Sequence, residues 1–269
     1  MSTVPSIAPR TVRRETLICL HSSGSTGRQW VPIAQALSAH CHVLTPDLLG
    51  YPGTHAWPID APTSLDDEAT ALAPLLNDGG VHLFGHSYGG SVALQIALRW
   101  PDRVKSLTLY EPVRFALLFR QPATAAAGDA IVKVGRQIGV EVQAGMPQAA
   151  AARFVDYWSG DGTWQRMQPR HQQTLATRMS KVRAEFEALF ADRVPASAFG
   201  ALPMPVHLIG GTRSPAPARL VLDILAENCR QATRTVLVGL GHMGPVDAPQ
   251  RVLDALGGSI PIPALAHAA

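Results

Sequence analysis

The stretch from Val81 to Leu98 restricts the possible folds of this chain more than any other. The short apolar run from Val81 to Phe84 predicts a buried strand, and Ser91 to Leu98 has the length and the residue types of a helix. The two are joined by Gly85-His-Ser-Tyr-Gly-Gly90, in which Ser87 lies between two glycines. A strand, a tight turn and a helix in this order form the context that a nucleophile elbow requires.

Ser87 is therefore the first candidate for a reactive group. Gly85 and Gly89 lack the Cβ atoms that would clash where the strand and the helix pack closely, so Ser87 is expected on a strained turn with its hydroxyl at the sheet edge. The backbone N–H of Tyr88 would lie in the first turn of the helix, directed at a developing oxyanion. Gly-x-Ser-x-Gly alone can arise by chance in a chain with 23 Gly. Its position between strand and helix favours a functional Ser87.

Strands and helices alternate along most of the remaining chain. Apolar runs predict further strands at 16–20, 41–45, 104–110, 206–210 and 235–238. Helical spacing lies at 30–39, 65–76, 218–228 and 249–256, and Ser64 followed by Asp67 predicts a helix N-cap. This alternation indicates an α/β fold with a mostly parallel sheet and helices on both faces.

The alternation stops between Pro112 and Leu202. This segment has helices and loops and is far longer than an ordinary connection of about 4–6 residues. We expect 112–202 to form a helical cap, or lid, inserted into a core made of 1–111 and 203–269. Most aromatic residues of the cap are expected to pack within it. The candidates for lining a substrate pocket are Phe115, Phe119 and Trp158.

The composition excludes several classes of protein. With 269 residues, 46% of them hydrophobic and 16% charged, the chain can bury a large core. The formal charge of +3 comes from scattered residues, so a nucleic-acid partner is not expected. Three cysteines predict buried thiols in a reducing compartment. The polar N-terminus, without a signal-like apolar core, and the lack of a run of about 20 apolar residues favour a cytoplasmic protein without a membrane partner.

A serine hydroxyl needs a base within hydrogen-bond reach before it can act as a nucleophile. His242 is the best-placed histidine, because it follows the last strand in a glycine-rich loop, Gly239 to Pro245. His21, at the end of the first strand, is its main competitor. A metal site is not expected, because His40-Cys41-His42 has no second pair at zinc-like spacing. A phosphate-bearing cofactor is not expected either, since the glycine-rich turn lacks the lysine that would hold phosphates.

Taken together, these segments resemble the α/β-hydrolase superfamily, in the lidded branch that includes esterases and carbon–carbon bond hydrolases. The resemblance spans nearly the whole chain. It rests on the inserted cap and on four motifs: His21-Ser-Ser-Gly, Pro46-Asp47, Gly85-His-Ser-Tyr-Gly-Gly90 and Gly241-His-Met. The antiparallel first strands of the family have little room in residues 1–14, so a shortened sheet is expected here.

The resemblance also directs the search for the acid of a catalytic triad. The turn that usually carries it, Gly210 to Pro215, has no carboxylate, and Asp223 lies too far into the next helix. In some members, such as certain haloalkane dehalogenases, the acid ends the strand after the elbow helix, and Glu111 stands there in this chain. Because the carboxyl ends of parallel strands share one edge, Glu111 would emerge beside Ser87. The alternative is a surface carboxylate paired with Arg114 or Arg213.

A tetrahedral oxyanion needs two donors. The resemblance implies that the N–H of Ser23 is the second, beside that of Tyr88. Ser22 stands where the family usually has glycine, and the hydroxyls of Ser22 and Ser23 either add donors or satisfy the loop backbone. His21, Ser22 and Met243 join the aromatic candidates as residues expected to contact the substrate.

The sequence thus predicts a serine hydrolase that cleaves an ester-type acyl compound, small and partly apolar, through Ser87, His242 and Glu111. A dehalogenase is disfavoured, because those enzymes use a carboxylate nucleophile. Within the same scaffold, a carbon–carbon bond hydrolase, a thioesterase and an acyl transferase remain open. A ligand receptor that keeps the fold without turnover is the alternative from another class.

Overall fold

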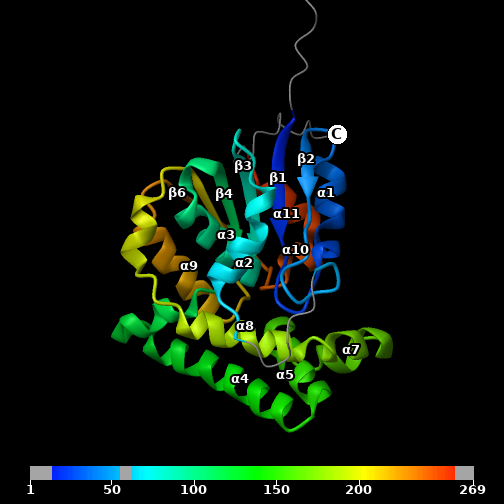
Figure 1. The fold of residues 1–269 in the computed structure, drawn as a ribbon. Coiled ribbons are helices and arrows are strands. Elements are labelled where there is room, and N and C mark those ends of the chain that lie inside the picture. Colours follow the sequence, from blue (N-terminus) through cyan, green and yellow to red (C-terminus); the bar gives the residue numbers. More distant parts are fainter. Residues whose placement is uncertain (1–13, 55–61, 258–269) are drawn as a thin grey trace, which may run out of the picture.

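The computed structural model describes residues 14–54 and 62–257, and its centre is a parallel sheet of six strands (Figure 1). The expectation for residues 1–14 falls almost wholly outside this part of the chain. Every neighbouring pair in the described sheet is parallel. In spatial order the strands are β2 (Cys41–Leu44), β1 (Glu15–Leu20), β3 (Val81–His86), β4 (Val104–Tyr110), β5 (Val206–Gly211) and β6 (Ala232–Leu237).

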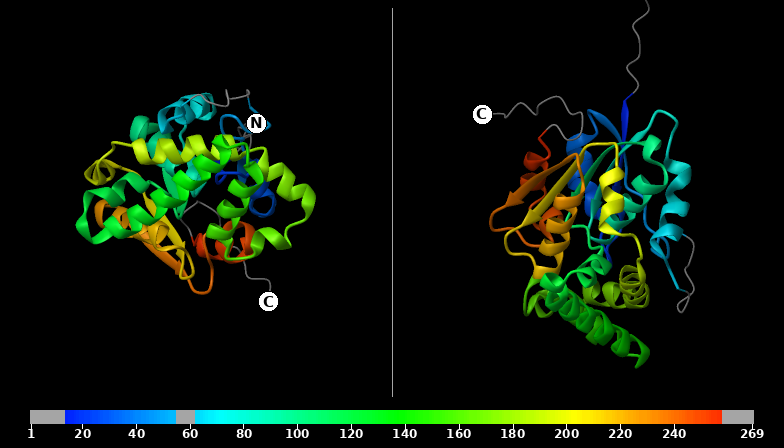
Figure 2. Two further views of the ribbon diagram at one scale, coloured as in Figure 1. Left: turned by 90° about the horizontal axis from the view of Figure 1, so that it is seen from below. Right: turned by 90° about the vertical axis from the view of Figure 1, so that its left-hand side faces the viewer.

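Helices cover both faces of the sheet (Figure 2). Because successive side chains of a strand point to opposite faces, β1 contributes to two hydrophobic clusters. Leu17 and Cys19 pack in the cluster with α1 and α11, whereas Ile18 and Leu20 pack in the cluster with α2, α3 and α9. These helices and the short α10 are α1 (Val31–Leu37), α2 (Leu65–Leu72), α3 (Tyr88–Arg99), α9 (Ala216–Asn228), α10 (Gly244–Asp247) and α11 (Pro249–Ala255).

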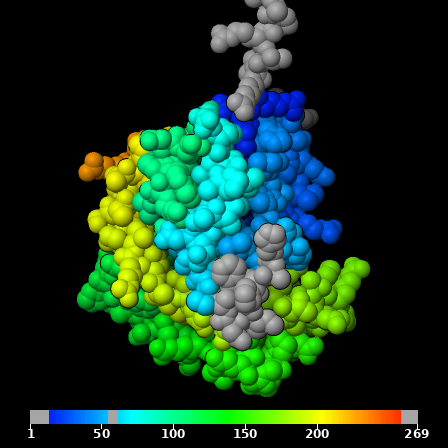
Figure 3. All heavy atoms as spheres, in the orientation of Figure 1, coloured from blue at the N-terminus to red at the C-terminus, as the bar shows by residue number. Residues whose placement is uncertain are grey.

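Between β4 and β5 the chain forms a layer of helices across one end of the sheet (Figures 1 and 3). We call residues 112–202 the insertion; its status as a separate cap domain stays a prediction. Its helices are α4 (Ala125–Gln143), α5 (Pro147–Ser159), α6 (Thr163–Arg166), α7 (Pro169–Ala176) and α8 (Met179–Ala191). The short 3₁₀ turns of the described chain lie at Gly27–Trp30, Ala73–Leu75, Pro101–Arg103, Phe115–Arg120, Pro122–Thr124 and Ala196–Ala201.

Several element boundaries differ from those expected. The helix expected over 30–39 is a 3₁₀ turn followed by α1, which ends at Leu37. β6 begins at Ala232 rather than Thr235, because an edge strand exposes polar residues such as Arg234 that an apolar pattern does not detect. The N-cap expected at Ser64 is present: its hydroxyl accepts the Asp67 N–H at 3.1 Å, and Asp67 Oδ2 accepts the Ser64 N–H at 3.0 Å.

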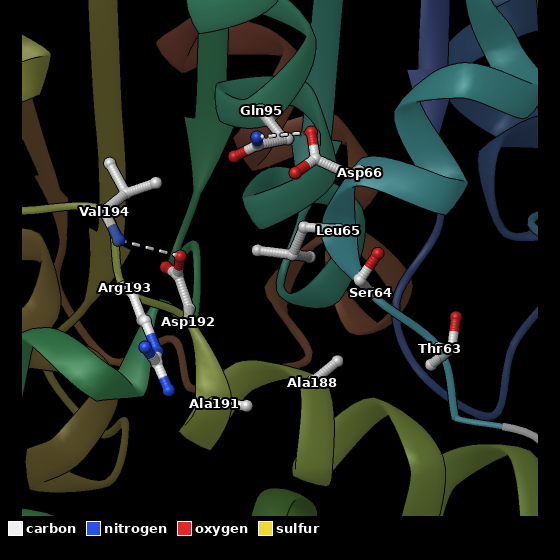
Figure 4. Close-up of a pocket in the computed structure, with 10 residues that line it drawn as sticks. All are labelled: Thr63, Ser64, Leu65, Asp66, Gln95, Ala188, Ala191, Asp192, Arg193 and Val194. Atoms are coloured by element: carbon white, nitrogen blue, oxygen red, sulfur yellow. Dashed lines mark hydrogen bonds between the residues drawn. The ribbon is translucent and has the colours of Figure 1, made fainter.

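A buried ion pair joins the two ends of the insertion to each other and to α3. The Arg114 guanidinium is fully buried and lies 2.7 Å from Asp192 Oδ2, and it also donates to Gln95 Oε1 at 3.1 Å. Asp192 and Gln95 line a pocket of about 350 Å³ at the seam between α8 and the core (Figure 4). None of the catalytic candidates lines this pocket, so we interpret the seam as structural.

Arg114→Ala is expected to destabilise the fold strongly. Its loss leaves Asp192 buried without its partner, which costs about 3–5 kcal/mol. The free energy of unfolding, measured by urea titration, would report this loss. The matched control is Arg193→Ala, because that side chain is exposed beside the same pocket and its loss should change stability by no more than about 0.5 kcal/mol. Equal losses for the two variants would contradict a structural role for the Arg114–Asp192 pair.

Candidate active site

Ser87 lies at the junction of β3 and α3 in a conformation that few non-glycine residues adopt. Its φ is +55°, and its N–H donates to Tyr110 O at 3.0 Å, which continues the ladder between β3 and β4. A Cβ on Gly85 would lie 2.5 Å from Gly90 Cα, and a Cβ on Gly89 would clash with the carbonyl of Leu20. The glycines therefore allow the close packing that holds the strained Ser87 turn, as the sequence predicted.

Ser87, His242 and Glu111 form one hydrogen-bonded chain. His242 Nδ1 lies 2.7 Å from Glu111 Oε2, and His242 Nε2 lies 2.9 Å from Ser87 Oγ. Because the carboxylate oxygen can only accept, Nδ1 carries the proton and Nε2 accepts the Ser87 hydroxyl. The structure thus brings together the three residues that the sequence had placed far apart along the chain.

Glu111 is a fully buried residue at the end of β4, with φ of +44°. Its Oε1 accepts the Gly211 N–H at 2.7 Å and the Ser214 hydroxyl at 2.5 Å, while Oε2 faces His242. The alternative of a surface carboxylate is wrong, because Glu111 is fully buried, and Arg114 pairs with Asp192 instead. Donors from β5 and the following turn satisfy the carboxylate, which leaves Oε2 to orient the imidazole.

A second chain of hydrogen bonds holds the loop that carries His242. His86 Nε2 lies 2.8 Å from His242 O, a carbonyl that can only accept, so His86 Nδ1 accepts from Gln29 Nε2 at 3.0 Å. Gln29 Oε1 in turn accepts the N–H and the hydroxyl of Ser22. Burial lowers the pKa of His86 well below its usual range, which keeps the ring neutral for this arrangement. The Ser22 hydroxyl therefore donates to the Gln29 side chain rather than to the loop backbone.

His21, the competing candidate for the base, holds the backbone of the same loop. Its Nδ1 donates to Ser22 O at 2.8 Å and its Nε2 accepts the Leu48 N–H at 3.0 Å. Burial lowers the pKa of His21 to about 4. With both ring nitrogens bonded to backbone, His21 positions the loop, and His242 is the histidine that reaches Ser87.

The aromatic candidates occupy different positions. Trp158 stacks on the His242 ring with a centroid distance of 4.0 Å, so the insertion contacts the catalytic candidates directly. Phe115 is buried and stacks with Trp158 at 6.3 Å. Phe119 is 43% exposed and lies against Phe190. Met243 follows His242 and is partly buried. Trp158 is thus the aromatic candidate that contacts His242, and Phe115 packs against Trp158.

A buried polar cluster beside the Ser23 loop was not predicted from the sequence. Tyr51 OH accepts the Gly24 N–H at 2.7 Å and donates to Glu185 Oε1 at 2.9 Å. Lys181, one turn before Glu185 on α8, bonds Glu68 of α2 at 2.7 Å. The only signal in the sequence was the spacing of four between Lys181 and Glu185, which is also typical of an exposed helix face.

No group of three or more His, Cys, Asp or Glu side chains in the described part of the chain could hold a metal ion. Cys19, Cys41 and Cys229 are free and buried. Among the helices at 14–54 and 62–257, none combines the length and the apolar character that crossing a bilayer requires.

Comparisons with known proteins extend this picture. Lipase LipV of Mycobacterium tuberculosis (strain ATCC 25618 / H37Rv) is 38% identical over 99 residues, which make up 36% of this chain and 36% of that lipase. The (lyso)-N-acylphosphatidylethanolamine lipase of Homo sapiens is 30% identical over 176 residues, which make up 64% of this chain and 50% of that protein. The chain thus spans half or less of the length of these curated relatives.

The likeness in structure extends over more of the chain. A solved hydrolase from Pseudomonas aeruginosa PA01 superposes with a TM-score of 0.76 and 22% identity, covering 93% of this chain and 91% of that one. At this identity the likeness concerns the fold. The sequence model of the alpha/beta hydrolase family matches residues 17–255, which is nearly all that the structure describes. The chain therefore belongs to the alpha/beta hydrolase family.

Proposed function

We propose that this chain is a serine hydrolase that cleaves an ester-type acyl substrate through a Ser87–His242–Glu111 triad and an acyl-enzyme. The observation that carries the proposal is the continuous hydrogen-bonded chain from Glu111 Oε2 through the imidazole to Ser87 Oγ. A nucleophile, a base bonded to it and a third group that orients the base are the parts that nucleophilic catalysis needs.

In the proposed mechanism, Ser87 Oγ attacks the carbonyl carbon while its proton passes to His242 Nε2. The imidazolium that forms is stabilised by Glu111, whose carboxylate also keeps the ring in the required tautomer. Collapse of the tetrahedral intermediate breaks the bond to the leaving alcohol, which takes the proton from His242. A water molecule then attacks the acyl-enzyme with His242 as base, and the acid product is released.

The oxyanion of the tetrahedral intermediate would be held by two backbone amides. Tyr88 begins α3, and the first N–H groups of a helix have no acceptor inside it and favour negative charge. Ser23 would supply the second N–H from the loop after β1. Ser22, Gln29 and His86 connect this loop to the loop of His242, which supports a common geometry for both.

The surroundings of His242 favour an acyl compound with an apolar part. Trp158 supplies aromatic surface beside the base, and Phe115 packs against Trp158. Two of the relatives are named as lipases, which agrees with the proposal. The free thiols of Cys19, Cys41 and Cys229 fit a reducing compartment, so we place the enzyme in the cytoplasm.

Ser87→Ala is expected to abolish hydrolysis of p-nitrophenyl esters, with a rate loss of about 10⁴-fold or more, because the nucleophile is removed. Steady-state kinetics on p-nitrophenyl butyrate would measure this loss. A fluorophosphonate probe should label Ser87 in the wild-type chain and fail to label the variant. Retained turnover in the variant, or a wild-type chain that the probe does not label, would overturn the proposal and favour a receptor.

Glu111→Gln is expected to lower kcat by roughly 10³–10⁴-fold, because an amide cannot accept all the hydrogen bonds that the carboxylate accepts and disturbs the tautomer of His242. The matched control is Arg213→Ala, an exposed residue two positions after Gly211, which should leave kcat within about twofold. The two kcat values on the same ester decide the assignment. If Arg213→Ala were the more damaging change, Glu111 would not be the acid.

A further inference from the structure

Three charged residues form a buried cluster that the proposed mechanism does not use. Lys181 and Glu185 lie one turn apart on α8, and Glu68 lies on α2; all three side chains are buried. Lys181 Nζ is 2.7 Å from Glu68 Oε1 and 3.8 Å from Glu185 Oε1. Because desolvation offsets most of the attraction in a buried ion pair, such a cluster is weak evidence for a role in stability alone.

One arm of the cluster reaches the loop that carries Ser23. Glu185 Oε1 accepts the Tyr51 hydroxyl at 2.9 Å, and the Tyr51 oxygen accepts the N–H of Gly24 at 2.7 Å. Arg178, immediately before α8, donates to Gly24 O at 2.7 Å. Both polar backbone groups of the residue after Ser23 are therefore bound by groups that lead back to the insertion.

The other arm reaches Tyr88. Glu68 Oε2 accepts the Leu49 N–H at 2.9 Å, and Glu68 Oε1, which bonds Lys181, also lies 3.4 Å from the Tyr88 hydroxyl. Burial raises the pKa of both Tyr51 and Tyr88 well above the usual range, so both hydroxyls keep their protons and remain donors. The two residues proposed to bind the oxyanion are thus connected to one helix of the insertion.

We propose that Lys181 and Glu185 are positioning residues that fix the two backbone N–H groups of the oxyanion hole relative to each other. Glu185 acts on the Ser23 loop through Tyr51 and Gly24. Lys181 acts on Tyr88 through Glu68. This inference rests on the proposed function. Oxyanion donors stabilise a transition state only when they are already in place, so a loop that moves loses catalysis without losing the triad. The insertion would then contribute to the catalytic geometry as well as cover the site.

The charge state of Glu185 adds a second consequence. Burial raises the pKa of this carboxyl to about 7, while the positive charge of Lys181 and the Ser23 hydroxyl oppose the rise by favouring the ionised form. The charged or titratable groups that face Glu185 are Lys181 on its own helix, Glu68 on α2 and Tyr51 in the loop after β2, with Tyr88 beside Glu68. An ionised carboxylate is the stronger acceptor for Tyr51.

The test measures kcat, KM and the affinity for an alkylboronic acid, whose serine adduct mimics the tetrahedral oxyanion. Glu185→Leu and Tyr51→Phe should each lower kcat by about 10-fold or more, part of the effect of losing one oxyanion donor, while KM stays within about twofold. Boronic acid affinity should fall in parallel with kcat/KM. The double variant should lose no more than the worse single one, because both changes break one connection.

The matched control is Glu187→Leu, the same change two residues further along α8. The Glu187 side chain is 60% exposed and pairs only loosely with Arg183, at 3.8 Å, so kcat should stay within about twofold. Glu185→Gln is the conservative variant, because it keeps an acceptor for Tyr51. Its kcat should lie between those of the wild type and Glu185→Leu, and Tyr51→Phe decides the matter if Glu185→Leu fails to fold.

A pH profile separates positioning from packing. The ratio of wild-type kcat to Glu185→Gln kcat should rise between pH 6 and pH 8, because at this position only the wild-type carboxyl ionises in that range. Unchanged kcat and boronic acid affinity in Glu185→Leu and Tyr51→Phe, or a flat ratio, would overturn the inference. If the wild-type chain neither turns over esters nor reacts with fluorophosphonate, the proposed function itself has failed. If the wild-type chain is active and the kcat values of Glu185→Leu and Tyr51→Phe are unchanged, only the present inference is overturned.

Discussion

The buried carboxylate of Glu111 is the constraint on which the rest of the site depends. A carboxylate without solvent is tolerated only when its oxygens accept hydrogen bonds, and here the donors come from Gly211, Ser214 and His242. These residues belong to β5, to the turn after it and to the loop after β6. The ends of the neighbouring parallel strands must therefore be packed correctly before the carboxylate receives all its hydrogen bonds. The geometry of the site thus depends on the packing of the sheet.

Strain in the backbone is concentrated at the same place. In the described chain, Ser87 and Glu111 are the two non-glycine residues with positive φ, and each follows a strand of the sheet centre. Their N–H groups continue the strand ladders, bonding Tyr110 O and Ile209 O. The surrounding hydrogen bonds thus hold two unfavourable conformations that direct side chains out of the strand ends towards His242.

The insertion contacts this arrangement with two kinds of group. Trp158 places an aromatic face on the His242 ring, which excludes water from one side of the imidazole. Glu185 and Lys181 bring charge into a dry region, which is unfavourable by itself and becomes acceptable only through partners on the core. Those partners adjoin the residues that we propose to bind the oxyanion. A shift of the insertion relative to the core would therefore alter the loops after β1 and β3 together.

The sequence by itself determined the α/β alternation, the elbow around Ser87 and the position of His242 after the last strand. Strand runs, glycine turns and helix caps are local signals, and parallel strands necessarily end at one edge. It left Glu111 open between a buried and a surface role, because local pattern does not report which donors surround a carboxylate. Only the tertiary structure decided that question, the stacking of Trp158 on His242 and the meeting of Glu68, Tyr51 and Glu185. These contacts join α2, the loop after β2 and α8, which are far apart along the chain. Such long-range contacts produce no local sequence pattern, because they depend on how the insertion packs against the sheet.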